Sequence, residues 1–112
     1  MKNKLEYVVL VIALLSITNT LQATDYYIGL NGDDNNSGTS PEQAWKNISK
    51  INKMQFSAGD GIFFEGGQIF LGSIQFDSND NGTPKNPITI GSYGRGRAII
   101  DSGQEHGLYA HN

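Results

Sequence analysis

Short apolar runs of alternating character recur along the chain, separated by turns rich in Gly, Asn and Asp. The branched and aromatic side chains of these runs favour β-strands, whereas glycine and short polar residues favour turns. The pattern predicts strands at 26–30, 62–65, 69–76, 88–93 and 98–101. We expect a kink at Gly72, inside the longest run, because glycine within a strand often marks a bend or bulge.

One amphipathic helix is predicted between the first two strands. Ser40 can cap the first free backbone N–H groups, Pro41 suits the first helical position, and Gln43 completes a Ser-x-x-Gln capping box. The helix is expected to continue to about Met54. Its apolar stripe would consist of Ala44, Ile48 and Ile51. That stripe needs a partner, so we expect the helix to cover the first open end of a stack of β-strands.

The first 23 residues have the layout of a secretory signal peptide. Lys2 and Lys4 precede an apolar run at 7–15, and a more polar stretch then ends in Ala23. A membrane-spanning helix needs about 20 apolar residues, which is more than this run contains. We therefore expect export with cleavage after Ala23, a secreted or periplasmic protein, and no membrane association once the leader is removed.

Charge and cysteine content narrow the class of partner. The chain carries a formal net charge of −3 and has no cysteine, so no disulfide can stabilise it. A mildly acidic chain without a basic patch argues against nucleic acid as a partner. The composition leaves the oligomeric state open.

The order of the elements suggests a division of the chain. Residues 1–23 form the leader, residues 24–60 an N-terminal cap of strand, polar loop and helix, and residues 61–112 the first coils of a stacked β structure. Each coil of such a stack covers its apolar face against a neighbour, and at least three are needed for stability. We therefore expect the stack to be incomplete at Asn112, as in a truncated fragment.

Several segments occur in a characteristic order. They are 26–28 (Tyr-Tyr-Ile), 31–39 (Asn-Gly-Asp-Asp-x-x-Ser-Gly-Thr), 41–45 (Pro-x-x-Ala-Trp), 58–60 (Ala-Gly-Asp) before 62–64, 86–90 (Asn-Pro-Ile-Thr-Ile) and 98–101 (Ala-Ile-Ile-Asp). In this order they resemble the N-terminal region of bacterial secreted right-handed parallel β-helix proteins, the pectate-lyase-like superfamily. The resemblance spans residues 25–101 and implies a mainly β, right-handed parallel β-helix fold.

The resemblance also implies an activity on extracellular polysaccharide. Members include glycoside hydrolases and lyases that cleave uronic-acid polymers by β-elimination, and we expect a lyase. In such lyases a Lys or Arg removes the α proton, and a bound calcium neutralises the uronate carboxylate and can stabilise the negative charge that develops. Those groups stand on later coils, beyond Asn112. The resemblance therefore assigns no catalytic and no cofactor-binding residue here, and it makes calcium a candidate cofactor of a longer parent only.

Two interpretations from other classes remain open. A non-catalytic β-helix could bind glycans or serve as an adhesin-like scaffold, and a truncated fragment could be inactive. Further coils with clustered Asp, Lys and Arg would favour an enzyme. Further coils without such clusters would favour a non-catalytic scaffold.

Two polar loops share features with calcium-binding loops. Asp33, Asn35 and Ser37 alternate in the first loop, and the second repeats this spacing at 77–81. Both echo the first half of a calcium loop, but the position of the bidentate Glu is Ala44 in the first loop and Ile88 in the second. The same residue types are typical of plain turns, which is the favoured interpretation.

The remaining candidates each have a structural interpretation that we favour. The side chains of His106 and His111 could ligate zinc with Glu105 and Asp101, but two histidines without regular ligand spacing are a weak signal. Arg95 and Arg97 could bind an acidic sugar through bidentate hydrogen bonds, but we favour solvated residues on a tight turn. Trp45 could stack on a sugar ring, but we favour a packing role in the predicted cap.

Overall fold

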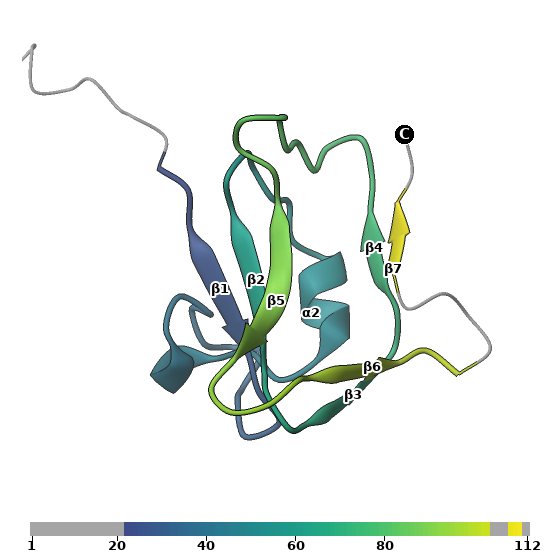
Figure 1. Cartoon of the computed structure of the whole chain (residues 1–112). Helices are drawn as coiled ribbons and strands as arrows, with labels where there is room; N and C mark the ends of the chain where they lie inside the picture. Colours follow the sequence, from purple (N-terminus) through teal and green to yellow (C-terminus); the bar gives the residue numbers. More distant parts are fainter. Residues whose placement is uncertain (1–21, 104–107, 111–112) are drawn as a thin grey trace, which may run out of the picture.

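The computed structural model describes residues 22–103 and 108–110 (Figure 1). Strands predominate, with two short helices between the first and second strands. In chain order the elements are β1 Asp25–Ile28, the 3-10 helix η1 Pro41–Gln43, α2 Ile48–Asn52, β2 Gly61–Glu65, β3 Ile69–Leu71, β4 Ile74–Phe76, β5 Thr89–Tyr93, β6 Ile99–Asp101 and β7 Leu108–Ala110. The predicted strand positions are therefore confirmed, to within a residue or two at the ends.

All strand pairs within the described residues are parallel. The strands form three sheets with the orders β1-β2-β5, β3-β6 and β4-β7. Each of β2, β3 and β4 thus pairs with the strand three places later, so that Ile62 lies beside Ile90 and Ile69 beside Ile99. The predicted fold is confirmed only in part, as parallel sheets within a small mixed α/β domain, and none of these sheets closes on itself within residues 22–103 and 108–110.

The core lies in the space between the three sheets, which surround α2 in the view of Figure 1. Alternate strand residues point into it because successive side chains of a strand face opposite sides. Ile48 and Ile51 of α2 are buried against them. The buried cluster consists of Ile28, Trp45, Ile48, Ile51, Phe56, Ile62, Phe64, Phe70 and Ile74. The helix therefore covers the apolar interior, as the sequence predicts.

The predicted extent of the helix is wrong. The residues from Ser40 form only η1, and the side chain of Ser40 makes no capping hydrogen bond. The chain is extended at Trp45, whose N–H donates to Tyr27 O at 2.9 Å, while Gly29 N–H donates to Trp45 O at 2.8 Å. Trp45 therefore pairs with the chain at the end of β1 like a short strand. This long-range pairing outweighs the local capping signals, and α2 begins only at Ile48.

The predicted kink at Gly72 divides the long apolar run into β3 and β4. Gly72 has a φ of 126°, a conformation that residues with a side chain rarely adopt. Its N–H donates to Asp101 O at 3.0 Å, so the corner is attached to the end of β6. Phe70 and Ile74 both remain buried on either side of the corner. The glycine thus redirects the chain from one sheet to the next without exposing the core.

The predicted leader lies almost wholly outside the described residues, so export stays a prediction. No helix in residues 22–103 or 108–110 has the length and apolar character needed to cross a membrane. Thr24, directly after the predicted cleavage position, already belongs to the fold, because its N–H donates to Asp60 Oδ1 at 2.9 Å.

Candidate functional site

The outward face of the β1-β2-β5 sheet gathers aromatic and polar side chains. Ile28, Ile62 and Phe64 point into the core, so the alternate residues of the same strands point away from it. Register then places Tyr27 beside Phe63, and Glu65 beside Tyr93. We call the half-buried group Tyr27, Phe63, Glu65, Gln68 and Tyr93 the outer-face cluster.

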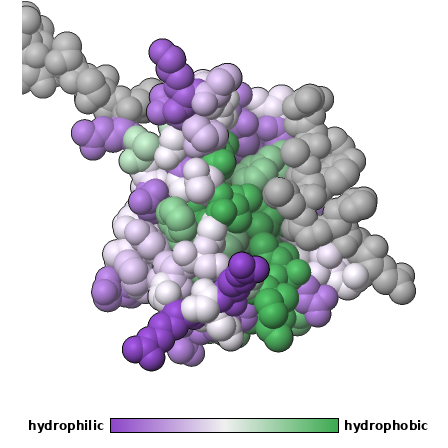
Figure 2. All heavy atoms as spheres, in the orientation of Figure 1, coloured by the Kyte–Doolittle hydropathy of each residue, from purple (hydrophilic) through white to green (hydrophobic). Residues whose placement is uncertain are grey.

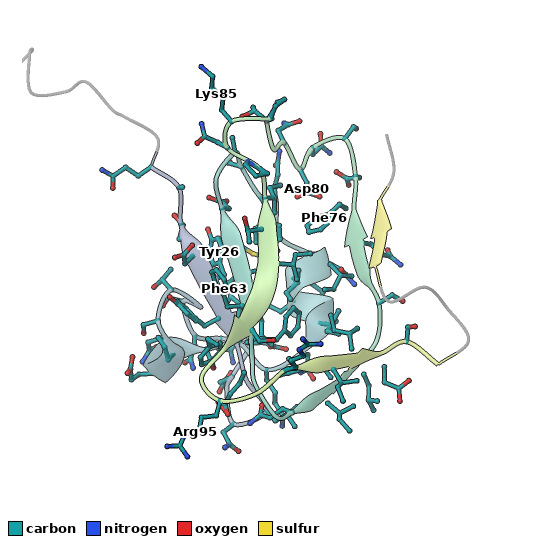
Figure 3. All side chains as sticks on the ribbon, in the orientation of Figure 1. Tyr26, Phe63, Phe76, Asp80, Lys85 and Arg95 are labelled. Atoms are coloured by element: carbon teal, nitrogen blue, oxygen red, sulfur yellow. The ribbon has the colours of Figure 1, made fainter. Side chains whose placement is uncertain are left out.

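The aromatic rings of this cluster touch one another. The ring centroids of Tyr27 and Phe63 are 5.9 Å apart with an interplanar angle of 31°, and those of Tyr27 and Tyr93 are 5.2 Å apart at 89°. These separations and the edge-to-face angle are favourable for aromatic pairs. The three rings, from three strands, therefore form one connected aromatic surface; Figure 3 labels Phe63 on β2.

Glycines on the same face leave room for the Phe63 ring. A Cβ on Gly91 would lie 3.3 Å from Cδ1 and Cε1 of Phe63, and a Cβ on Gly61 would lie 2.5 Å from its Cε2. The ring thus lies down across the sheet, over the two positions where neighbouring side chains would otherwise stand. Since Phe63 is half-buried, one side of the ring rests on the sheet and part of it remains open to solvent.

Glu65 is the polar centre of the cluster. Its Oε1 accepts a hydrogen bond from the Tyr93 hydroxyl at 3.4 Å, and its Oε2 accepts one from Gln68 Nε2. Gln68 Oε1 in turn accepts from Leu30 N–H at 2.8 Å. A Cβ on Gly29 would be only 3.1 Å from both the Glu65 carboxylate and the Tyr93 hydroxyl, so the backbone also holds these groups closely.

The electrostatics of the cluster are acidic. Burial raises the pKa of the Tyr93 hydroxyl, and the negative charges of Glu65 and, more weakly, Glu42 raise it further. The phenol therefore stays protonated and can donate to Glu65 at neutral pH. With rings for stacking and carboxylate oxygens for accepting hydrogen bonds, the cluster can bind a group that carries hydroxyls, and it repels anions.

The outward acids of β1 and β2 are too far apart for paired acid–base catalysis. Asp25 pairs with Gly61, and Glu65 lies four residues further along β2. At a rise of about 3.3 Å per residue, this spacing separates the two backbone positions by roughly 13 Å along the strands. Glycoside hydrolases place their carboxyl pairs about 5 to 9.5 Å apart. Asp25 and Glu65 therefore do not form such a pair.

A second surface feature is an apolar patch over β3 and β6, where hydrophobic residues gather in Figure 2. Its members are Leu30, Ile69, Leu71 and Ile99, whose exposed fractions are 43%, 53%, 76% and 55%. A hollow of about 320 Å³ opens beside it, lined by Leu30, Lys46, Asn47, Ile48, Ile69, Phe70 and Leu71. We call this the β3 hollow.

Asp34 fixes the loop at the edge of the β3 hollow. Its Oδ1 accepts from the N–H groups of Lys46 and Asn47, each at 2.9 Å, and its Oδ2 accepts from Asn47 Nδ2 at 2.9 Å. Partial burial alone would raise the pKa of Asp34. The hydrogen bonds from Asn47 and Lys46, together with the charge of Lys50, outweigh burial and lower the pKa. Asp34 is therefore a structural carboxylate.

The two loops that share features with calcium sites fold as turns. The Oδ1 of Asp33 accepts from Asn35 N–H and that of Asp77 from Asn79 N–H, each at 2.8 Å, which is the geometry of Asx turns. Asp80, labelled in Figure 3, accepts from Phe56 N–H at 2.8 Å. Within the part of the chain that the structure describes, no group of three or more acidic or histidine side chains is placed to hold a metal ion.

The other predicted candidates separate in space. Arg95 extends away from the body of the protein in Figure 3, at the turn after β5. Arg97 is also exposed, and its backbone O accepts from Gly67 N–H at 2.9 Å, which joins it to the turn between β2 and β3. His106 and His111, with Glu105, lie outside the described residues, whereas Asp101 ends β6 on the exposed face.

Trp45 is a core residue, as its favoured interpretation predicts. It is 1% exposed, stacks on Tyr26 with ring centroids 5.1 Å apart, and donates from Nε1 to Asn36 O at 2.8 Å. Its indole is therefore closed to a sugar ring.

The outer-face cluster was missed at the level of sequence. Tyr27, Phe63, Glu65 and Tyr93 each occupy the outward positions of their strands, so alternation alone could have placed them on one face. Their register across β1, β2 and β5 was the missing information.

Comparison with known proteins relates the chain to carbohydrate-degrading enzymes. It is 34% identical over 91 residues to a lacto-N-biosidase of Bifidobacterium longum subsp. longum, covering 76% of this chain and 6% of that protein. Two crystal structures of a glycoside hydrolase family 136 lacto-N-biosidase from Eubacterium ramulus, the selenomethionine derivative and the native protein, superpose with TM-scores of 0.57 and 0.55. Each is 31% identical and covers 65% of this chain and 12% of that one. No protein-family model matches the chain.

These similarities correct two expectations from the sequence. The pectate-lyase-like assignment is wrong, and so is the lyase chemistry inferred from it, because the similar proteins are glycoside hydrolases. The turn glycines and alternating strands that suggested the lyases specify backbone geometry, and the same geometry can carry different chemistries. The broader expectation of carbohydrate degradation agrees with the similarity, and so does a glycan as the kind of partner.

Proposed function

We propose that this chain forms part of an exported glycoside hydrolase that releases a disaccharide of the lacto-N-biose type from a glycan. The observation that carries the proposal is the 34% identity over 91 residues to a lacto-N-biosidase. The structural similarity at 31% identity, with a TM-score of 0.57, supports it. The chain spans about 6% of the length of the curated relative and 12% of the crystallised one, so the proposal concerns the polypeptide in which this sequence functions.

We also propose that the fold is the beginning of a right-handed parallel β-helix. The order β2-β3-β4 is followed by β5-β6-β7, and each strand of the first group pairs in parallel with its counterpart in the second. Two successive windings around one apolar core account for this pairing. The end of the core beneath the first winding is covered by Trp45 and α2.

Within such an enzyme the described residues supply framework and glycan contacts. Most glycoside hydrolases cleave the glycosidic bond with two carboxyl groups at close separation. The roughly 13 Å estimated between the backbone positions of Asp25 and Glu65 from strand rise does not match such a separation. We therefore assign no catalytic residue among the outward acids of β1 and β2.

The test is hydrolysis by the native polypeptide that carries this sequence, produced from its gene. We expect it to release lacto-N-biose from a chromogenic lacto-N-bioside, and to leave chromogenic single-sugar glycosides intact. Pectate with calcium serves as the comparison substrate, because a lyase would generate unsaturated products that absorb in the ultraviolet. Failure to release the disaccharide at saturating substrate would contradict the proposed activity.

Export is a separate proposal with its own test. The charged start, apolar run and polar stretch of the leader support it. Mass spectrometry of the protein recovered outside the cytoplasm should find a mature N-terminus at Thr24. Recovery of the protein only with Met1 intact would contradict export by cleavage.

A further inference from the structure

We propose that the outer-face cluster is a binding subsite for a neutral sugar, with the Phe63 ring as the stacking surface and Glu65 as the hydroxyl acceptor. The inference rests on the proposed function in taking the ligand from the glycans of a glycoside hydrolase. It goes beyond that function because it assigns ligand contacts to the outer-face cluster, which has a single carboxyl group and so lacks a catalytic pair.

The first support is the pose of Phe63. The ring rests on Gly61 and Gly91, where any Cβ would collide with it or press against it. The tilted Tyr27 ring contacts the Phe63 ring, with the two ring centroids 5.9 Å apart. A ring held flat and half-exposed presents an apolar surface of low conformational freedom, which suits the C–H face of a pyranose. Because few torsions remain to be fixed, stacking costs little side-chain entropy.

The second support is the position of Glu65 beside that ring. Phe63 and Glu65 are two residues apart on β2 and so project from the same face. The carboxylate is oriented by Gln68 and Tyr93, and a carboxylate with two oxygens retains lone pairs beyond those two bonds. Sugar hydroxyls are donors that can use the remaining lone pairs, in charge-assisted hydrogen bonds.

Charge selects a neutral ligand over an acidic one. The negative charges of Glu65 and Glu42 both act on Tyr93, raising the pKa of its hydroxyl in the same direction. The contacts of the cluster among the described residues come from neutral donors. A uronate or other anion would therefore be repelled, whereas a neutral hexose or N-acetylhexosamine unit would not.

A purely structural explanation would predict different behaviour. Aromatic residues laid over glycines can stabilise a sheet without binding anything. Under that explanation, replacing Phe63 would change the stability of the fold but not the affinity for sugars. The discriminating variant is Phe63→Leu, which keeps apolar volume over the glycines and removes the ring. The matched control is Leu71→Gln, at a side chain that is 76% exposed on a different sheet.

The experiment titrates lacto-N-biose into the native polypeptide and both variants by calorimetry, with digalacturonate as the acidic comparison. We expect Phe63→Leu to weaken disaccharide binding roughly 3- to 10-fold, the effect of losing one aromatic stacking contact. Leu71→Gln should bind like the wild type, and digalacturonate should bind at least tenfold more weakly than lacto-N-biose. Equal binding by Phe63→Leu and wild type, equal weakening by both variants, or equal binding of the acidic sugar overturns the proposal.

A second measurement does not depend on the variant folding. With ring-labelled phenylalanine in the wild type, the Phe63 resonances should shift on titration with lacto-N-biose, and unshifted resonances overturn the proposal. Hydrolysis of the chromogenic lacto-N-bioside, measured on the same wild-type sample, separates the two proposals. Hydrolysis without a response at Phe63 overturns this subsite alone, whereas a response at Phe63 without hydrolysis overturns the proposed activity alone.

Discussion

The indole of Trp45 lies so close to Gly38 that a Cβ on Gly38 would stand 2.3 Å from Cε2 of the ring. Gly38 also has a φ of 75°, in the left-handed region that favours glycine. Two separate requirements, backbone conformation and space, therefore fix the residue type at this position. Trp45 is in turn held by Tyr26 and by its bond to Asn36, so the ring has little freedom to move aside.

We predict that Gly38→Ala destabilises the fold by about 2 to 4 kcal/mol, through left-handed strain plus displacement of the indole. The matched control is Gly94→Ala, because Gly94 has the same φ of 75° and a Cβ added there would meet nothing within 4 Å. That change should cost only about 1 kcal/mol. Chemical denaturation followed by the fluorescence of the single tryptophan measures both. Equal losses would show that packing against Trp45 contributes nothing.

The buried carboxylate of Asp60 joins the start of β1 to the turn before β2. It is 5% exposed, its Oδ1 accepts from Thr24 N–H, and its Oδ2 accepts from Ser57 N–H, each at 2.9 Å. Asp60→Ala should cost about 2 to 4 kcal/mol of unfolding free energy, because two N–H groups lose a charged acceptor. Asp60→Asn should fall between the alanine variant and the wild type, since an amide has one acceptor oxygen. Denaturant melts check the order, and an asparagine variant as unstable as the alanine variant would contradict it.

The lowered pKa of Asp34 predicts that the stability of the fold depends on pH in the acidic range. Burial opposes the shift, but the bonds from Asn47 and Lys46 lower the pKa of Asp34 in the folded state. A lowered folded pKa stabilises the fold above the unfolded pKa of about 4, and this contribution is lost as the pH falls through the folded value. Wild type should therefore exceed Asp34→Asn in melting temperature at pH 7, and the difference should narrow below about pH 4. A difference that stays constant down to about pH 2 would refute this account.

The raised pKa of Tyr93 predicts that the fold loses stability as the pH rises in the alkaline range. Its pKa is raised by burial and then by Glu65, so the folded state holds the phenolic proton longer than the unfolded state. Stability from this group is complete below the unfolded pKa of about 10 and is lost as the pH rises through the folded pKa. Glu65→Gln should move the Tyr93 titration down towards about 10. The ¹³Cζ shift of Tyr93 follows the titration directly, and an unchanged midpoint in Glu65→Gln would rule out the contribution of Glu65.

Strand positions and turns were predictable because their signals are local. The alternation in residues 62–65 and 88–93 is visible in the sequence, and Gly72 marks the corner between β3 and β4. The extent of the helix from Ser40 was not predictable, although its local signals are strong. Trp45 instead pairs with the chain at Ile28, a contact that no local pattern reveals, and the backbone there stays extended.

The candidate site and the chemistry needed information that a single sequence lacks. Tyr27, Phe63 and Tyr93 come together only through the register of three strands. The class of reaction was also beyond reach, because turn glycines and alternating strands define a framework and leave its catalytic groups unspecified. The expectation of a lyase was based on this framework. Only the similarity in sequence and structure related the chain to glycoside hydrolases instead.

The pairing of β2, β3 and β4 each with the strand three places later gives assembly a direction. Ile69 meets Ile99, which is 30 positions later in the chain, and Ile62 meets Ile90, 28 positions later. Closing such long segments is slow, since chain entropy must be lost before any contact compensates. In the β-helix proposed above, one winding would act as the template for the next, starting from the end of the core that Trp45 and α2 cover. In that arrangement a defect in the covered end would pass to the windings built on it, so changes near Gly38 should impair refolding more than changes of equal size in β6.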